Sequence, residues 1–83
     1  MPKVAITQSQ RKMQARKEKE AAFRGEIARY VAERGMHYGD LAQLARMKEV
    51  TLRKRRRYPE TFTVDELRRL CDVVGEQLKD YLF

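Results

Sequence analysis

The sequence predicts an all-α domain, a compact bundle of four to five short helices. The chain has 83 residues, 42% of them hydrophobic and 37% charged, with 4 glycines and 2 prolines. A chain of this length forms one domain at most, with a small core. The chain contains few helix breakers, and its apolar residues recur at helical spacing. Both observations favour helices over strands.

The first 17 residues are predicted to form a basic arm, partly helical or disordered, ahead of a folded domain at residues 18–83. Residues 1–20 carry six bases and two acids. Between residues 7 and 20 the apolar side chains are Met13 and Ala15 alone, which is too few for a buried stripe. Both a disordered terminus and a role in binding are compatible with this pattern.

The first firm helix is predicted from about residue 18 to residue 34. Four residues at i, i+4, i+7 and i+8 form its apolar stripe: Phe23, Ile27, Tyr30 and Val31. Gly35 occupies the favoured position after a helix end. Gly25 lies within the helix and costs about 1 kcal/mol relative to alanine, unless another helix crosses closely there.

A second helix is predicted at about residues 38–45. With His37 as N-cap, Met36 and Leu41 form a hydrophobic staple, and Asp40 places negative charge at the helix start. The predicted apolar stripe of this helix is narrow and contains small residues: Leu41, Ala42, Leu44 and Ala45.

A third helix is predicted from residue 48 or 49 to residue 56 or 57. Leu52, supported by Thr51, is the side chain expected to point to the core. Tyr58 precedes Pro59 and is therefore disfavoured in a helix, so it marks the end. Seven bases and one acid stand between residues 46 and 57, which indicates a polyanionic partner.

Two further helices are predicted in the C-terminal part. Thr63 and Glu66 match a capping box, Gly75 ends the helix at residues 64–74, and a last short helix covers residues 76–82. The expected buried residues of the longer helix are Leu67, Leu70, Cys71 and Val74. The last helix carries more apolar surface than a free tail exposes, so it packs on the core or meets a second copy.

Two short helices separated by two or three residues, the second rich in bases, form a helix-turn-helix arrangement. At about 100° per residue, Leu52 lies opposite the face that carries Val50, Arg53, Lys54 and Arg57. A helix that enters the major groove of DNA needs this opposition of core anchor and reading face.

The segment DLAQLARMKEVTLRK resembles the helix-turn-helix of lambda-repressor-like (Cro-type) regulators of bacteria and phages. Six residues match the family pattern: Leu41, Ala42, Ala45, Met47, Thr51 and Leu52. The following segment YPETFTVDELRRLCDVVG is also similar to small phage regulators of this family. Arg46 replaces the usual turn glycine and costs on the order of 1 kcal/mol if the turn is left-handed. Arg55 and Arg56 replace an apolar residue, so either their stems cover the core or the helix ends early.

The resemblance implies a dimeric, sequence-specific regulator that binds double-stranded DNA in a bacterial or phage-infected cytoplasm. The residues it implies for base reading are Lys48, Glu49, Val50, Arg53, Lys54 and Arg57. Arginine can contact guanine bidentately, glutamate accepts from cytosine, and valine can touch a thymine methyl group. The groups expected to contact phosphates are the backbone amide of Tyr38, at a helix N-terminus, and the side chains of Arg46, Arg55, Arg56, Arg11, Lys12, Arg16 and Lys17. The C-terminal helix is the expected homodimer contact.

Other functions receive less support from the sequence. We expect no enzymatic activity, cofactor, metal or small-molecule ligand, because the chain lacks a phosphate-binding glycine loop, metal-ligand spacing and a nucleophile with an evident base. The single cysteine excludes an internal disulfide, and no apolar run is long enough to span a membrane. Two alternatives stay open, an interaction protein that binds an acidic protein and an RNA-binding protein that uses the basic helix.

Overall fold

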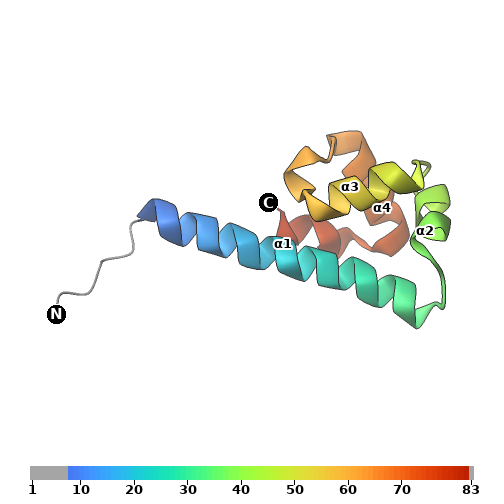
Figure 1. Cartoon of the computed structure of the whole chain (residues 1–83), viewed down its shortest axis with the longest axis horizontal. Helices are drawn as coiled ribbons and strands as arrows, with labels where there is room; N and C mark the ends of the chain where they lie inside the picture. The colour runs from blue at the N-terminus through green and yellow to red at the C-terminus, as the bar shows by residue number, and fades with distance from the viewer. Residues whose placement is uncertain (1–7, 83) are drawn as a thin grey trace.

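The computed structural model describes residues 8–82, with side chains from residue 12 onward. Helices are the regular structure of this part, which confirms the all-α prediction (Figure 1). The elements are α1 (Gln8–Glu33), α2 (Tyr38–Leu44), α3 (Glu49–Arg57), the 3-10 helix η1 (Pro59–Thr61), α4 (Val64–Val74) and the 3-10 helix η2 (Glu76–Tyr81). None of the helices in this part combines the length and apolar character that a bilayer crossing requires.

Helix α1 is longer than the sequence pattern predicts, because it begins at Gln8 rather than near Glu18. Residues 8–17, assigned to the arm, continue the same helix. They contain no glycine or proline and are dominated by glutamine, lysine, arginine and alanine, which favour helix without needing a buried face. The first half of α1 therefore projects from the body (Figure 1), and the molecule measures 53 × 25 × 22 Å.

The core is contributed by every α-helix and by η2. Its buried residues are Phe23, Ile27, Val31, Leu41, Ala42, Ala45, Leu52, Leu67, Leu70, Cys71 and Leu78. Tyr30 and Val74 were predicted to be buried, and in the structure they are half-buried and pack against this core. The prediction for Leu44 is wrong, since that side chain is 54% exposed. Leu41, Ala42 and Ala45 define the stripe, and a rotation of about 100° per residue takes Leu44 outside it.

The C-terminal elements contribute Leu67, Leu70, Cys71 and Leu78 to the same core. Thr63 and Glu66 form the predicted capping box of α4, with both hydrogen bonds at 3.0 Å. The helix ends at Gly75, whose φ of 142° suits a residue without a Cβ. Leu78 of η2 is fully buried, and Tyr81 donates a hydrogen bond of 3.3 Å to Glu26 of α1. The last segment thus packs on its own core.

Candidate nucleic-acid interface

Helices α2 and α3 are joined by a tight turn, as the sequence pattern predicts. His37 is the N-cap of α2, and its backbone N–H donates to Asp40 Oδ2 at 2.9 Å. Lys48 is the N-cap of α3, and Met47 N–H donates back to the carbonyl of Ala42 at 2.9 Å. The carboxylate of Glu49 lies over the backbone of α2 at Gly39, where a Cβ would be 2.6 Å from Glu49 Oε1, the movable end of an exposed side chain.

The turn contains a strained residue held by an arginine from another helix. Arg46 has a φ of 56°, which is left-handed and disfavoured for a residue with a Cβ. Arg69 of α4 donates from Nη1 to the carbonyl of Ala45 at 3.2 Å and also to the carbonyl of Arg46. Its Nη2 lies 3.1 Å from Asp65 Oδ2. Sequence reasoning missed Arg69, since nothing in the local pattern connects α4 to this turn.

Helix α3 has two opposed faces. Leu52 is fully buried against the core, whereas Val50 is 71% exposed. Arg53, Lys54 and Arg57 are exposed on the side of Val50, which confirms the predicted geometry of the helix. An exposed apolar side chain flanked by three cations is a surface that can contact both the edges and the phosphates of a duplex.

One of these cations already has an intramolecular partner. Arg53 Nε lies 2.8 Å from Glu49 Oε2, and the two side chains are 58% and 50% exposed. Such an exposed ion pair one helical turn apart contributes little to stability, so it can exchange for a contact to DNA. Lys48 is exposed at the start of the same helix.

Arg55 and Arg56 follow the helix to its end and are half-buried, so α3 does not end early. Arg55 Nε lies 3.1 Å from Glu66 Oε1. The hydrogen bond from the Thr63 backbone N–H lowers the pKa of Glu66 below its usual value, and the charge of Arg55 lowers it further. Arg56 Nη2 donates to the carbonyl of Arg24 at 3.3 Å. Both guanidiniums are therefore anchored to other helices.

A cation-lined cavity lies beside α3. Its volume is about 210 Å³, and its lining is Arg24, Tyr38, Arg53, Arg56 and Arg57. The guanidiniums of Arg53 and Arg56 each lie 5.1 Å from the centre of the Tyr38 ring, which holds them in place. Four guanidiniums and no carboxylate in the lining suit an oxyanion such as a phosphate group. Sequence reasoning missed Arg24, because it belongs to α1 and only the fold brings it here.

The basic residues of the arm lie elsewhere. Lys12 and Arg16 line a separate groove that also includes Pro59, and Lys17 is exposed on α1. The side chain of Arg11 lies outside the described residues. The structure therefore does not gather these bases around the cavity beside α3. In residues 12–82 no cluster of three or more His, Cys, Asp and Glu side chains could hold a metal ion.

Comparison with known families agrees with this geometry. The model of the Cro/C1-type HTH DNA-binding domain matches residues 26–82, a range that includes α2, the turn, α3, α4 and η2. No curated protein and no solved structure matches the chain. Since the family match covers most of the chain and contains both helices of the helix-turn-helix, this protein belongs to the Cro/C1-type HTH DNA-binding domain family.

Proposed function

We propose that this DNA-binding protein is a sequence-specific regulator of transcription of the phage or prophage repressor type. The proposal rests on one observation, the opposition on α3 of a fully buried Leu52 and a 71% exposed Val50 flanked by cations. With α3 in the major groove, Val50 faces the floor of the groove, where a thymine methyl group can be contacted. No catalytic role is proposed.

The reading face is assigned to the exposed residues of α3. They are Lys48, Glu49, Val50, Arg53, Lys54 and Arg57. Arg57 has no carboxylate partner among the described side chains and is the stronger candidate for bidentate contact with guanine. Arg53 must release Glu49, which then becomes free to accept a hydrogen bond from cytosine N4.

Phosphate contacts are assigned to two groups of residues. The first group consists of Arg46 at the turn, of Arg24, Tyr38 and Arg56 at the cavity, and of Arg55 near the end of α3. The second group, on the first half of α1, consists of Arg11, Lys12, Arg16 and Lys17. Arg55 competes for this role with its own partner Glu66. If about six phosphates are engaged, log K falls with log salt at a slope of about −5.

A homodimer through the C-terminal segment completes the proposal, because one domain of this size covers only a half-site. Leu78 is used by the protomer's own core, so the contact would fall to the exposed face of η2, residues 76, 77, 79 and 80. Sedimentation equilibrium measures the mass directly. A monomer on DNA and in solution contradicts this part of the proposal.

The decisive experiment distinguishes residues that contact bases from residues that contact phosphates. Duplexes are first selected from a random pool with the full chain, and binding is then measured for the selected and for unrelated duplexes. Arg57→Ala is expected to weaken binding to the selected duplex by about 1 to 3 kcal/mol with little loss on unrelated ones. Arg24→Ala is expected to weaken both alike. Equal losses for Arg57→Ala on the two duplexes would contradict the assignment of α3 as the reading helix.

A further inference from the structure

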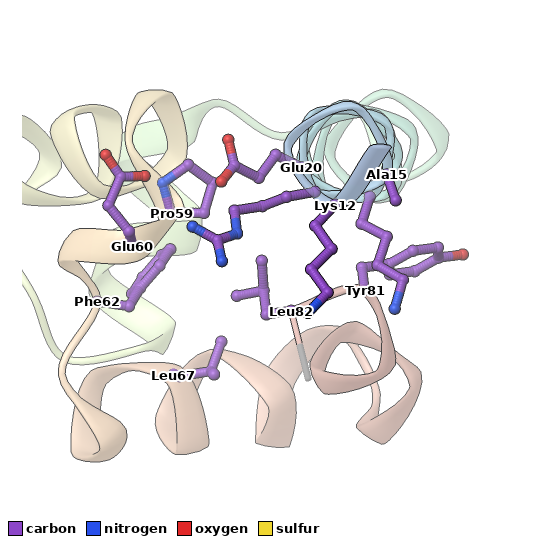
Figure 2. A pocket seen from close by; sticks show the side chains of 11 residues that line it. Lys12, Ala15, Glu20, Pro59, Glu60, Phe62, Leu67, Tyr81 and Leu82 are labelled. Carbon is purple, nitrogen blue, oxygen red and sulfur yellow. The ribbon is translucent and has the colours of Figure 1, made fainter. Parts of the chain in front are cut away.

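A second concave surface lies along the first half of α1. The groove has a volume of about 520 Å³ and runs between the first half of α1 and the body of the domain (Figure 2). None of the residues assigned to base reading lines it. Its floor is apolar and consists of Pro59, Phe62, Leu67 and Leu82. Phe62 is held in position by edge-to-face contact with Phe23, whose ring centre is 5.6 Å away.

The α1 wall of this groove is rich in cations, whereas the floor is apolar. Phe23 lies on the buried stripe of α1, and the positions 4, 7 and 11 residues before it on the same stripe are Lys19, Arg16 and Lys12. These three cations line the groove and form no ion pair with any side chain of residues 12–82. Because cations cannot close onto an apolar floor without desolvation, the groove stays open.

The mismatch defines the chemistry of an occupant. A DNA backbone would leave its phosphates on the apolar floor, which is unfavourable. A second copy that inserted its own α1 would bring residues 8–19, with five bases and one acid, against the cationic wall. An occupant that is apolar on one side and acidic on the other satisfies both surfaces.

The dimensions fit a short helix. Lys12 and Glu20 are eight positions apart on α1, which corresponds to about 12 Å along the groove. Two apolar anchors at i and i+7 of an amphipathic helix are about 10.5 Å apart. Glu20 of α1 and Glu60 line the groove with Pro59 (Figure 2), whereas Lys12 lies two helical turns before Glu20 on α1. Acidic side chains of the occupant are therefore favoured at the end of Lys12.

We propose that this groove binds an acidic amphipathic helix from a partner protein. The apolar side of the helix packs on Phe62 and Leu82, and its carboxylates pair with Lys12, Arg16 and Lys19. The reading face on α3 is not part of this surface. The partner helix therefore leaves the DNA contacts of α3 free, but it competes with DNA phosphates for Lys12 and Arg16.

The test uses the full chain and a fluorescein-labelled helical peptide of about 15 residues, with leucines at i, i+4 and i+7 and glutamates around them. Fluorescence anisotropy is expected to show saturable binding. Ala15→Glu, which adds an acid at an exposed position of the groove wall, is expected to weaken binding about tenfold, and so is the double change Lys12→Glu with Arg16→Glu. Lys17→Glu, exposed on the same helix but outside the groove, is expected to leave binding within about twofold.

Results of three kinds would overturn the proposal. The first is a peptide with lysines in place of glutamates that binds equally well, or a glutamate peptide that does not saturate. The second is an equal loss for Lys17→Glu, which would mean a general charge effect. The third is a dimer in sedimentation that Ala15→Glu dissociates, which would assign the groove to a second copy. Circular dichroism of each variant checks that the helical fold is kept.

Discussion

Replacement of Arg46 by glycine is predicted to stabilise the protein. Arg46 stands between α2 and α3 with a φ of 56°. Its side chain is exposed and forms no ion pair with the described residues. The interactions that hold the turn use backbone atoms, namely the carbonyls of Ala45 and Arg46 that accept from Arg69. Glycine keeps all of these interactions and removes the Cβ that makes the left-handed conformation unfavourable.

Two opposing free energies give the magnitude. The left-handed conformation costs a residue with a Cβ about 1 to 2 kcal/mol. Glycine increases the conformational entropy of the unfolded chain, which offsets about 0.4 to 1 kcal/mol. The expected net gain is about 0.5 to 1 kcal/mol in the free energy of unfolding. For a domain of this size it raises the melting temperature by about 3 to 6 °C.

Urea denaturation followed by circular dichroism measures this gain, with Arg46→Ala as the matched control. Both variants remove the guanidinium, but only glycine relieves the strained φ. With a slope of about 1 kcal/mol per molar urea, Arg46→Gly moves the midpoint up by about 0.5 to 1 M. Arg46→Ala is expected to stay within about 0.5 kcal/mol of the wild type, as for an ordinary surface change. If alanine stabilises as much as glycine, or if glycine destabilises, the strain at Arg46 is not the cause.

Three further predictions concern single positions. Gly25→Ala is expected to raise the free energy of unfolding by about 1 kcal/mol, because a Cβ there would meet nothing within 4 Å inside a regular helix; unchanged urea midpoints would contradict this. Thr63→Ala removes the acceptor for Glu66 N–H and is expected to cost about 1 kcal/mol by the same assay. Glu66 has its pKa lowered in the folded state from 4.5, so its contribution is complete above that pH and is lost as the pH falls through the folded pKa. Glu66→Gln keeps the capping pattern, and its stability deficit relative to the wild type should shrink on acidification; a deficit independent of pH would argue against this.

The sequence was sufficient for most of the fold because the local signals agreed with one another. The capping box at Thr63 and the stop at Gly75 placed α4 correctly, and Tyr58 before Pro59 placed the end of α3. The start of α1 was not predicted, since a helix segment that projects into solvent needs no recurring apolar residues and so shows no such pattern in the sequence. Leu44 was assigned to the core although it lies at the end of a short helix, where a small rotational difference decides burial.

The candidate site was predictable only where its residues lie on one helix. The faces of α3 follow from the helical period, so Val50 and Leu52 could be assigned without coordinates. Arg24 and Arg69 act across the fold, at 32 and 24 positions from the residues whose groups they contact. Long-range contacts of this kind leave no local pattern. The pairing of Arg55 with Glu66 could not be foreseen for the same reason.

The turn between α2 and α3 carries a cost in stability at Arg46 and also a cation that DNA can contact. Arg46 places a cation beside the reading helix at a position where glycine would be more stable. Arg69 holds the carbonyls on either side, so the turn keeps its shape whichever residue stands there. The effects of backbone strain and of charge can therefore be measured separately at this position. Arg46→Gly and Arg46→Ala both remove the guanidinium, but only Arg46→Gly is expected to change stability. If Arg46 contacts a phosphate, the two variants weaken DNA binding equally and reduce the salt slope by about 0.9. Unequal losses would show that the geometry of the turn, rather than the charge of Arg46, determines affinity.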